Sequence, residues 1–150
     1  MSIRNLIPVL FFGLLSIGCM NTKEIQLKPI EFEELWRTNK ATSLPEISVV
    51  NTMAELTQLY SDLQDPRYPK SAPIPIFDQN TETILVLNPQ LTSVKNGDIE
   101  IESIELSKDT FSVTYKEIEN WEHKENNLSH PIVLVKVNHK GNKAKLKLTN

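Results

Sequence analysis

The feature that most restricts the fold is the only cysteine, Cys19, because its position divides the chain in two. It follows an apolar stretch of 12 residues at positions 6–17, with Arg4 before the stretch and the small Gly18 directly before the cysteine. This order is typical of a bacterial lipoprotein signal, which is cleaved in front of the cysteine. The stretch is too short for a membrane-spanning helix, which needs roughly 20 apolar residues. We therefore expect a signal peptide over residues 1–18 and a folded part made from the remaining 132 residues.

Cys19 is the residue expected to attach the chain to a membrane. Two or three acyl chains would hold it firmly, since each buried methylene stabilises membrane association by about 0.8 kcal/mol. Ser16 stands where such signals usually have Leu, and the alternative is an ordinary secretory signal that leaves Cys19 as a free thiol. Met20 is not the aspartate that would retain a lipoprotein in the inner membrane, so the expected location is the cell envelope, with the outer membrane favoured.

Composition excludes several classes of function. Arg4 is the only charged residue among the first 18, so 15 bases and 19 acids remain after cleavage, a formal net charge of −4 that does not suggest nucleic-acid binding. With Cys19 lipidated, disulfides, iron–sulfur clusters, cysteine nucleophiles and thiolate metal sites are excluded together. Outside the signal only Gly97 and Gly141 remain, too few for a glycine-rich phosphate loop. We expect no cofactor.

Beyond Cys19 we expect a short tether over residues 19–28, which is polar after the cysteine and has no clear period, and one domain over residues 29–150. Residues 32–36 favour a strand. A helix is predicted from Thr52, because the sequence Thr-Met-Ala-Glu forms a capping box in which hydroxyl and carboxylate bond to free backbone amides. Asp65-Pro66 should end the helix, and the four prolines between positions 66 and 75 predict a rigid surface connection.

From Thr83 onward the chain has short apolar and β-branched runs that predict strands. Residues 84–87 suit a strand covered on both faces, residues 98–106 change their inward parity near Glu102-Ser103 and predict a bulge, and residues 111–115 alternate. Residues 132–137 and 144–148 flank a turn and predict a closing hairpin. The expected fold is therefore α+β, with one helix in the N-terminal half packed on a mostly antiparallel sheet of five or six strands.

No residue pattern predicts catalysis or a metal site. The three histidines, His123, His130 and His139, match no zinc spacing, and His123 between two glutamates is better interpreted as part of a solvated loop than as a metal ligand. No serine lies in a glycine-flanked nucleophile elbow. We expect a protein that is not an enzyme; a hydrolase using His123 or His130 is the weaker alternative.

Two sets of side chains have both a structural and a functional interpretation. Five lysines near the C-terminus either deter edge-to-edge strand pairing, which we favour, or contact anionic headgroups, lipopolysaccharide or an acidic partner. They are Lys136, Lys140, Lys143, Lys145 and Lys147. Three aromatic side chains either fill the end of the core, which we favour, or offer flat rings to a glycan. They are Trp36, Tyr68 and Trp121.

From about residue 45 to residue 148 the chain resembles the PrcB C-terminal domain family, named after a lipoprotein that binds and stabilises a surface protease complex. The matching segments are residues 47–50, 53–60, 75–78, 83–87, 97–101 and 129–137. The chain departs from the family at two places, with Val-Lys-Asn-Gly-Asp in place of a Thr-Gly-Gly-Tyr-like turn and Ile132 in place of a tyrosine. The resemblance implies a binding or assembly module that is not an enzyme.

These observations predict a lipid-anchored envelope protein whose domain binds another protein. Loops on rigid scaffolds usually carry recognition, so the expected surface holds the Asn96-Gly97 turn, the proline-rich connection, Trp121 and the segment up to His130. The alternative is an envelope receptor for a small molecule or glycan, in which Trp121 or Tyr68 stacks on the ligand.

Overall fold

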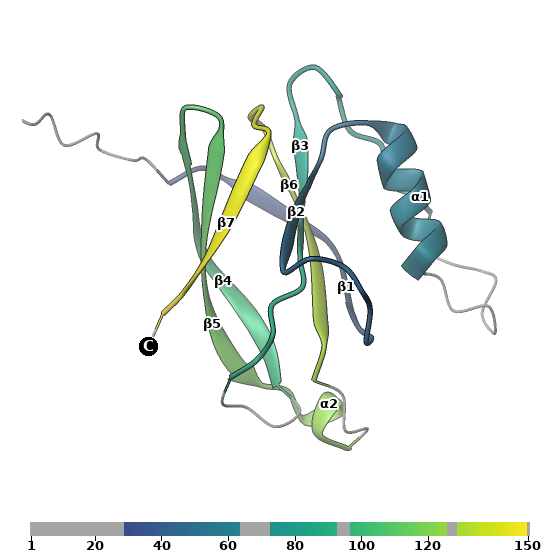
Figure 1. Cartoon of the computed structure of the whole chain (residues 1–150), viewed down its shortest axis with the longest axis vertical. Helices are drawn as coiled ribbons and strands as arrows, with labels where there is room; N and C mark the ends of the chain where they lie inside the picture. The colour runs from purple at the N-terminus through teal and green to yellow at the C-terminus, as the bar shows by residue number, and fades with distance from the viewer. Residues whose placement is uncertain (1–28, 64–72, 93–96, 126–128, 150) are drawn as a thin grey trace, which may run out of the picture.

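The computed structural model describes residues 29–63, 73–92, 97–125 and 129–149, which form seven strands and two helices (Figure 1). The predictions for the signal peptide, Cys19, the tether, Tyr68 and Asn96 lie outside these residues. The elements in chain order are β1 (Phe32–Asn39), β2 (Ile47–Val50), α1 (Met53–Leu63), β3 (Thr83–Leu87), β4 (Gly97–Ser107), β5 (Thr110–Glu119), α2 (Trp121–Glu125), β6 (Pro131–Val137) and β7 (Lys143–Leu148).

The strands form two sheets that face each other (Figure 1). One has four strands in the order β1-β6-β3-β2 and is antiparallel throughout. The other has three strands in the order β4-β5-β7, with β4 antiparallel and β7 parallel to the central β5. The α+β class is confirmed, but the single sheet, the single helix and the strand number are not. The strand that the sequence did not predict is β2, whose four residues are too few for a period to show.

Two apolar cores lie on opposite faces of the four-stranded sheet. Helix α1 covers one face through Leu56, Leu59, Tyr60 and Leu63, and the three-stranded sheet covers the other. Strands β3 and β6 serve both cores, because alternate side chains along a strand point to opposite faces. All five residues of β3 are buried, which confirms the prediction of a strand covered on both faces.

The predicted start of α1 is confirmed in atomic detail. The backbone N–H of Glu55 donates to the hydroxyl of Thr52 at 3.2 Å, and the Glu55 carboxylate accepts from the N–H of Thr52 at 3.1 Å and of Asn51 at 3.0 Å. The hydrogen bond from Asn51 is the largest cause of a lowered pKa at Glu55. The described part of the helix runs to Leu63, and the end predicted at Asp65-Pro66 lies outside the described residues.

Two further local predictions are confirmed in the three-stranded sheet. The register of β4 against β5 shifts between Ile101 and Ser103, which is the bulge expected from the change of parity. Along β5, Phe111, Val113 and Tyr115 are buried and alternate with half-buried polar residues.

The predicted closing hairpin is wrong, because β6 and β7 belong to different sheets. After β6 the chain crosses to the three-stranded sheet, where the N–H groups of Asn142 and Lys143 donate to Asp109 O at 2.9 and 3.1 Å. The burial patterns explain the separation. β6 is almost entirely buried, as a strand between two layers must be, whereas β7 alternates between exposed and half-buried residues, as an outer strand does.

The two sheets also meet where the described chain begins. Pro29 forms a bridge with Glu105, and the N–H of Ile30 donates to Ile104 O at 2.8 Å, so the chain touches β4 before it enters the four-stranded sheet as β1. From there β1 and β4 belong to different sheets, and side chains must hold them together at their other ends.

Substitution of Gly141 tests the crossing to β7. Gly141 is buried against the ring of Phe111, and an added Cβ would lie 2.9 Å from both Cδ2 and Cζ of that ring. We expect Gly141→Ala to lower the free energy of unfolding by about 1–3 kcal/mol, as overpacking does in a full core. Urea denaturation measures the loss, with the exposed Lys143→Ala as the control that stays near wild type. Equal stability of the two variants would contradict this packing.

Candidate functional site

A buried carboxylate, Asp98, joins the two sheets at the start of β4. Only 2% of the surface of Asp98 is exposed. Oδ1 accepts from Arg37 Nη1 at 2.6 Å and from the N–H of Ile99 at 2.8 Å, and Oδ2 accepts from Asn120 Nδ2 at 3.0 Å. Burial of a charge is strongly unfavourable unless a partner and hydrogen bonds compensate it, and Asp98 has both. These contacts link β1, β4 and the residue that precedes α2.

Arg37 forms the centre of this link. Nη1 also donates to Ile99 O at 2.8 Å, while Nε and Nη2 donate to the two carboxylate oxygens of Glu34 at 2.8 and 2.7 Å. Burial acts to lower the pKa of Arg37, but the hydrogen bond to Glu34 and the charges of Asp98 and Glu34 outweigh it and raise the pKa above its ordinary value. The guanidinium is therefore a permanent cation held between an inner and an outer carboxylate.

His123 completes the cluster from α2. Its Nδ1 lies 3.1 Å from Asn39 Nδ2 and 3.8 Å from Asp98 Oδ2. Asn39 Oδ1 accepts from the N–H of His130 at 2.7 Å, so the Asn39 amide nitrogen faces His123 as a donor. Nδ1 of His123 is therefore the acceptor in this contact.

Three of the four binding residues predicted from the sequence meet around this cluster. Gly97 is buried next to Asp98 and pairs with Glu119. Trp121 follows Asn120, and His130 is fixed through its backbone, with its N–H on Asn39 and its carbonyl accepting from Lys40 N at 2.9 Å. The fourth, Asn96, lies outside the described residues.

Sequence reasoning missed the residues that hold the site together. Arg37, Asn39, Asp98 and Asn120 had no predicted role, and Arg37 and Asp98 are 61 positions apart in the chain. The available signal was an aspartate at the very start of an apolar strand, where a charge needs a buried partner. The segment from Trp121 was also expected to be a loop, whereas residues 121–125 form the short helix α2.

The aromatic residues divide between the two interpretations. Trp36 stacks on Tyr60 with ring centroids 5.3 Å apart, so the prediction that it belongs to the core is confirmed. The same prediction is wrong for Trp121, which is 68% exposed although it lies beside a buried network. α2 is held against β4 while its first residue projects into solvent.

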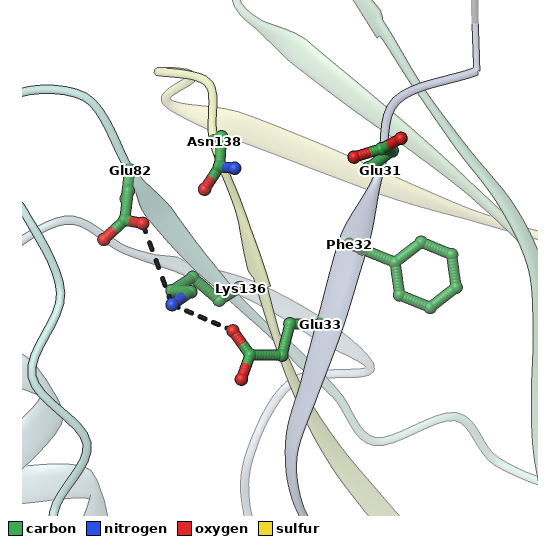
Figure 2. A pocket seen from close by; sticks show the side chains of 6 residues that line it. All are labelled: Glu31, Phe32, Glu33, Glu82, Lys136 and Asn138. Carbon is green, nitrogen blue, oxygen red and sulfur yellow. Dashed lines mark ion pairs between the residues drawn. The ribbon is translucent and has the colours of Figure 1, made fainter.

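A separate pocket of about 250 Å³ lies between β1, the start of β3 and the end of β6 (Figure 2). Figure 2 shows Lys136 between Glu33 and Glu82, with Phe32 on the other side of β1. The Lys136 ammonium is 2.9 Å from Glu33 and 3.7 Å from Glu82. The hydrogen bond to Glu33 is the largest cause of the raised pKa of Lys136 and, with Glu82, outweighs the lowering by burial. The pocket is polar and its cation is already paired.

Comparison of the chain with protein-family models, curated proteins and solved structures finds no match. Within the described ranges, no three His, Cys, Asp or Glu side chains come together as a metal site would require. In the same part of the chain, no helix has the length and apolar character needed to cross a membrane.

Removal of the Asp98 carboxylate should leave the half-buried guanidinium of Arg37 with only its outer partner Glu34 and the carbonyl of Ile99. We expect Asp98→Ala to lower the free energy of unfolding by about 3 kcal/mol, the lower end of what breaking a buried ion pair costs. Glu34→Ala removes the outer partner of the same Arg37 and should cost at most about 1 kcal/mol, because that carboxylate is solvated. Chemical denaturation of both variants measures the difference. If both lose the same amount, Asp98 is not the main support of this end of the fold.

Proposed function

We propose that this chain is a lipid-anchored protein of the cell envelope whose domain binds another protein through the surface around α2. The observation that carries the proposal is Trp121, whose large ring is exposed at a rigidly held position. Tryptophan is among the residues most enriched at the energetic centres of protein interfaces. The support behind it is preorganised, since Asn120 and His123 both connect α2 to the cluster around Asp98.

The chemistry of the cluster supports binding rather than catalysis. Asp98 is occupied by Arg37, Asn120 and a backbone amide, and Nδ1 of His123 accepts from Asn39. Both groups therefore hold structure in the arrangement described. A rigid base with an exposed aromatic residue suits a partner-binding surface, because little conformational entropy is lost on association.

The membrane anchor is proposed from Cys19 and the apolar stretch before it, with the outer membrane favoured. The resemblance to the PrcB C-terminal domain family suggests a complex-stabilising role, and an extracytoplasmic protease is the first partner to look for. The residues near His130 belong to the same proposed surface. Gly97, from the predicted Asn96-Gly97 turn, is buried as the first residue of β4 and lies beneath this surface.

A second candidate is a receptor for a small molecule or glycan. The pocket beside Lys136 favours it, since about 250 Å³ could hold a small ligand. The ligand would have to compete with Glu33 and Glu82 for the only cation among the described lining residues.

Truncation of Trp121 tests the protein-binding surface. We expect Trp121→Ala in the full-length protein to weaken partner recovery by at least about 30-fold, the effect of losing a central interface residue, without a change in the melting temperature. The measurement is crosslinking in the native cells, affinity recovery and mass spectrometry. Ile76→Ala is the matched control, because Ile76 is 86% exposed and lies outside α2 and the cluster.

Three results would contradict this proposal. Equal losses from Trp121→Ala and Ile76→Ala would remove the special role of α2, and a lowered melting temperature of Trp121→Ala would make the residue structural. Recovery of no protein by the wild type would favour the receptor. The anchor is tested separately, since Cys19→Ser should lose the acyl mass and release the protein from the membrane fraction.

A further inference from the structure

The structure divides the five C-terminal lysines into two groups. Lys136 and Lys140 are engaged within the fold, the first between two glutamates and the second donating to Asn51 Oδ1 at 2.6 Å and to Glu82 O at 3.1 Å. The other three, which we call the β7 lysines, are all exposed: Lys143, Lys145 and Lys147.

The β7 lysines form a straight row on the outer face of the three-stranded sheet. Ala144, Leu146 and Leu148 alternate with them and pack into the core between the sheets, so the lysines point outward. Residues two apart on a strand are about 6.6 Å apart, so three ammonium groups follow one line. The neighbouring strand β5 places a hydroxyl residue opposite each of them. These residues are Thr110, Ser112 and Thr114.

Little negative charge balances this row. Among the described residues Lys145 and Lys147 have no ion pair, and Lys143 reaches only Asp109 at 4.0 Å while 72% of its side chain stays exposed. The acids of this sheet lie on β4 and at the end of β5. Glu100 pairs with Lys116 at 3.1 Å, and Glu102 accepts from the hydroxyl of Thr149, the residue after β7, at 2.6 Å. An otherwise acidic protein thus presents, along one strand, three exposed lysines of which only Lys143 has a described ion pair.

We propose that the β7 lysines dock on the anionic lipid headgroups of the membrane that carries the chain. The inference rests on the proposed lipid anchor for its geometry. The described chain begins at Pro29, bridged to Glu105 of β4, and β4 lies two strand spacings, about 10 Å, from β7. The ten residues from 19 to 28 can span up to about 35 Å, enough for the β7 face to reach the bilayer surface.

This docking would orient the domain. α2 packs against β4, at the opposite edge of the same sheet from β7, so the surface around Trp121 would stay accessible to a partner. The acidic residues elsewhere would be repelled from the headgroups, which favours contact through β7 alone.

The test uses the mature chain, residues 19–150, carrying Cys19→Ser, so that no acyl chain contributes to binding. Co-sedimentation is measured with phosphatidylcholine vesicles and with vesicles in which about one third of the lipid is phosphatidylglycerol. We expect binding only to the anionic vesicles at low salt, and its loss as salt screens the charges. The double variant Lys145→Gln and Lys147→Gln should bind at least about tenfold more weakly, since each lysine near an anionic surface contributes roughly fivefold.

Two controls separate this contact from net charge and from folding. The double variant Lys145→Arg and Lys147→Arg keeps the charges and should bind like the parent. Lys40→Gln removes a charge beside Leu63 of α1 and should have little effect. Circular dichroism confirms that each variant is folded. Equal affinity for the two vesicle types, or equal binding of the Gln and Arg variants, would overturn the proposal. If the vesicle test fails while the acylated wild-type protein is still found in the membrane fraction, the proposed lipid anchor stands and only the docking through the β7 lysines is overturned.

Discussion

The ion pair between Arg37 and Asp98 is the contact on which this end of the molecule depends. The two sheets share a core of apolar side chains, but apolar contact is not directional and does not fix where β1 stands relative to β4. Charge-assisted hydrogen bonds are directional. Arg37 bonds both to the Asp98 carboxylate and to the backbone carbonyl of Ile99, so it fixes the lateral position of one strand against the other. Asn120 donates to the other oxygen of the Asp98 carboxylate and so fixes the position of α2, which begins at the next residue.

Local features of the fold could be predicted from the sequence, because their causes are local. The capping box at Thr52, the bulge near Ser103 and the alternation along β5 each arise from residues a few positions apart. The assignment of strands to two sheets could not be predicted. The connection between β6 and β7 suits a hairpin as well as it suits a crossing to the other sheet. The two cases differ only in burial, since β6 is buried on both faces and β7 on one.

The candidate site likewise has residues that could be predicted from the sequence and residues that could not. Gly97, Trp121 and His130 were predicted because they lie in or next to connections, and they do come together. The buried group that unites them was not predicted, because the partners of Asp98 come from β1, from β4 and from the residue before α2. The exposure of single aromatic residues could not be predicted either. Trp36 in β1 and Trp121 at the start of α2 are the same residue type, yet one stacks in the core and the other faces solvent.

The strand order of the four-stranded sheet also governs how the domain folds. β6 lies between β1 and β3, so β1 has no strand partner, and β3 has only β2, until a segment from much later in the chain inserts between them. The hairpin of β4 and β5 precedes β6 and can form locally, whereas the larger sheet must close long loops before any of its central pairing stabilises it. Folding dominated by such distant pairings is slow. We therefore expect the insertion of β6 to be a late and cooperative event that completes both cores at once, since its side chains belong to each of them.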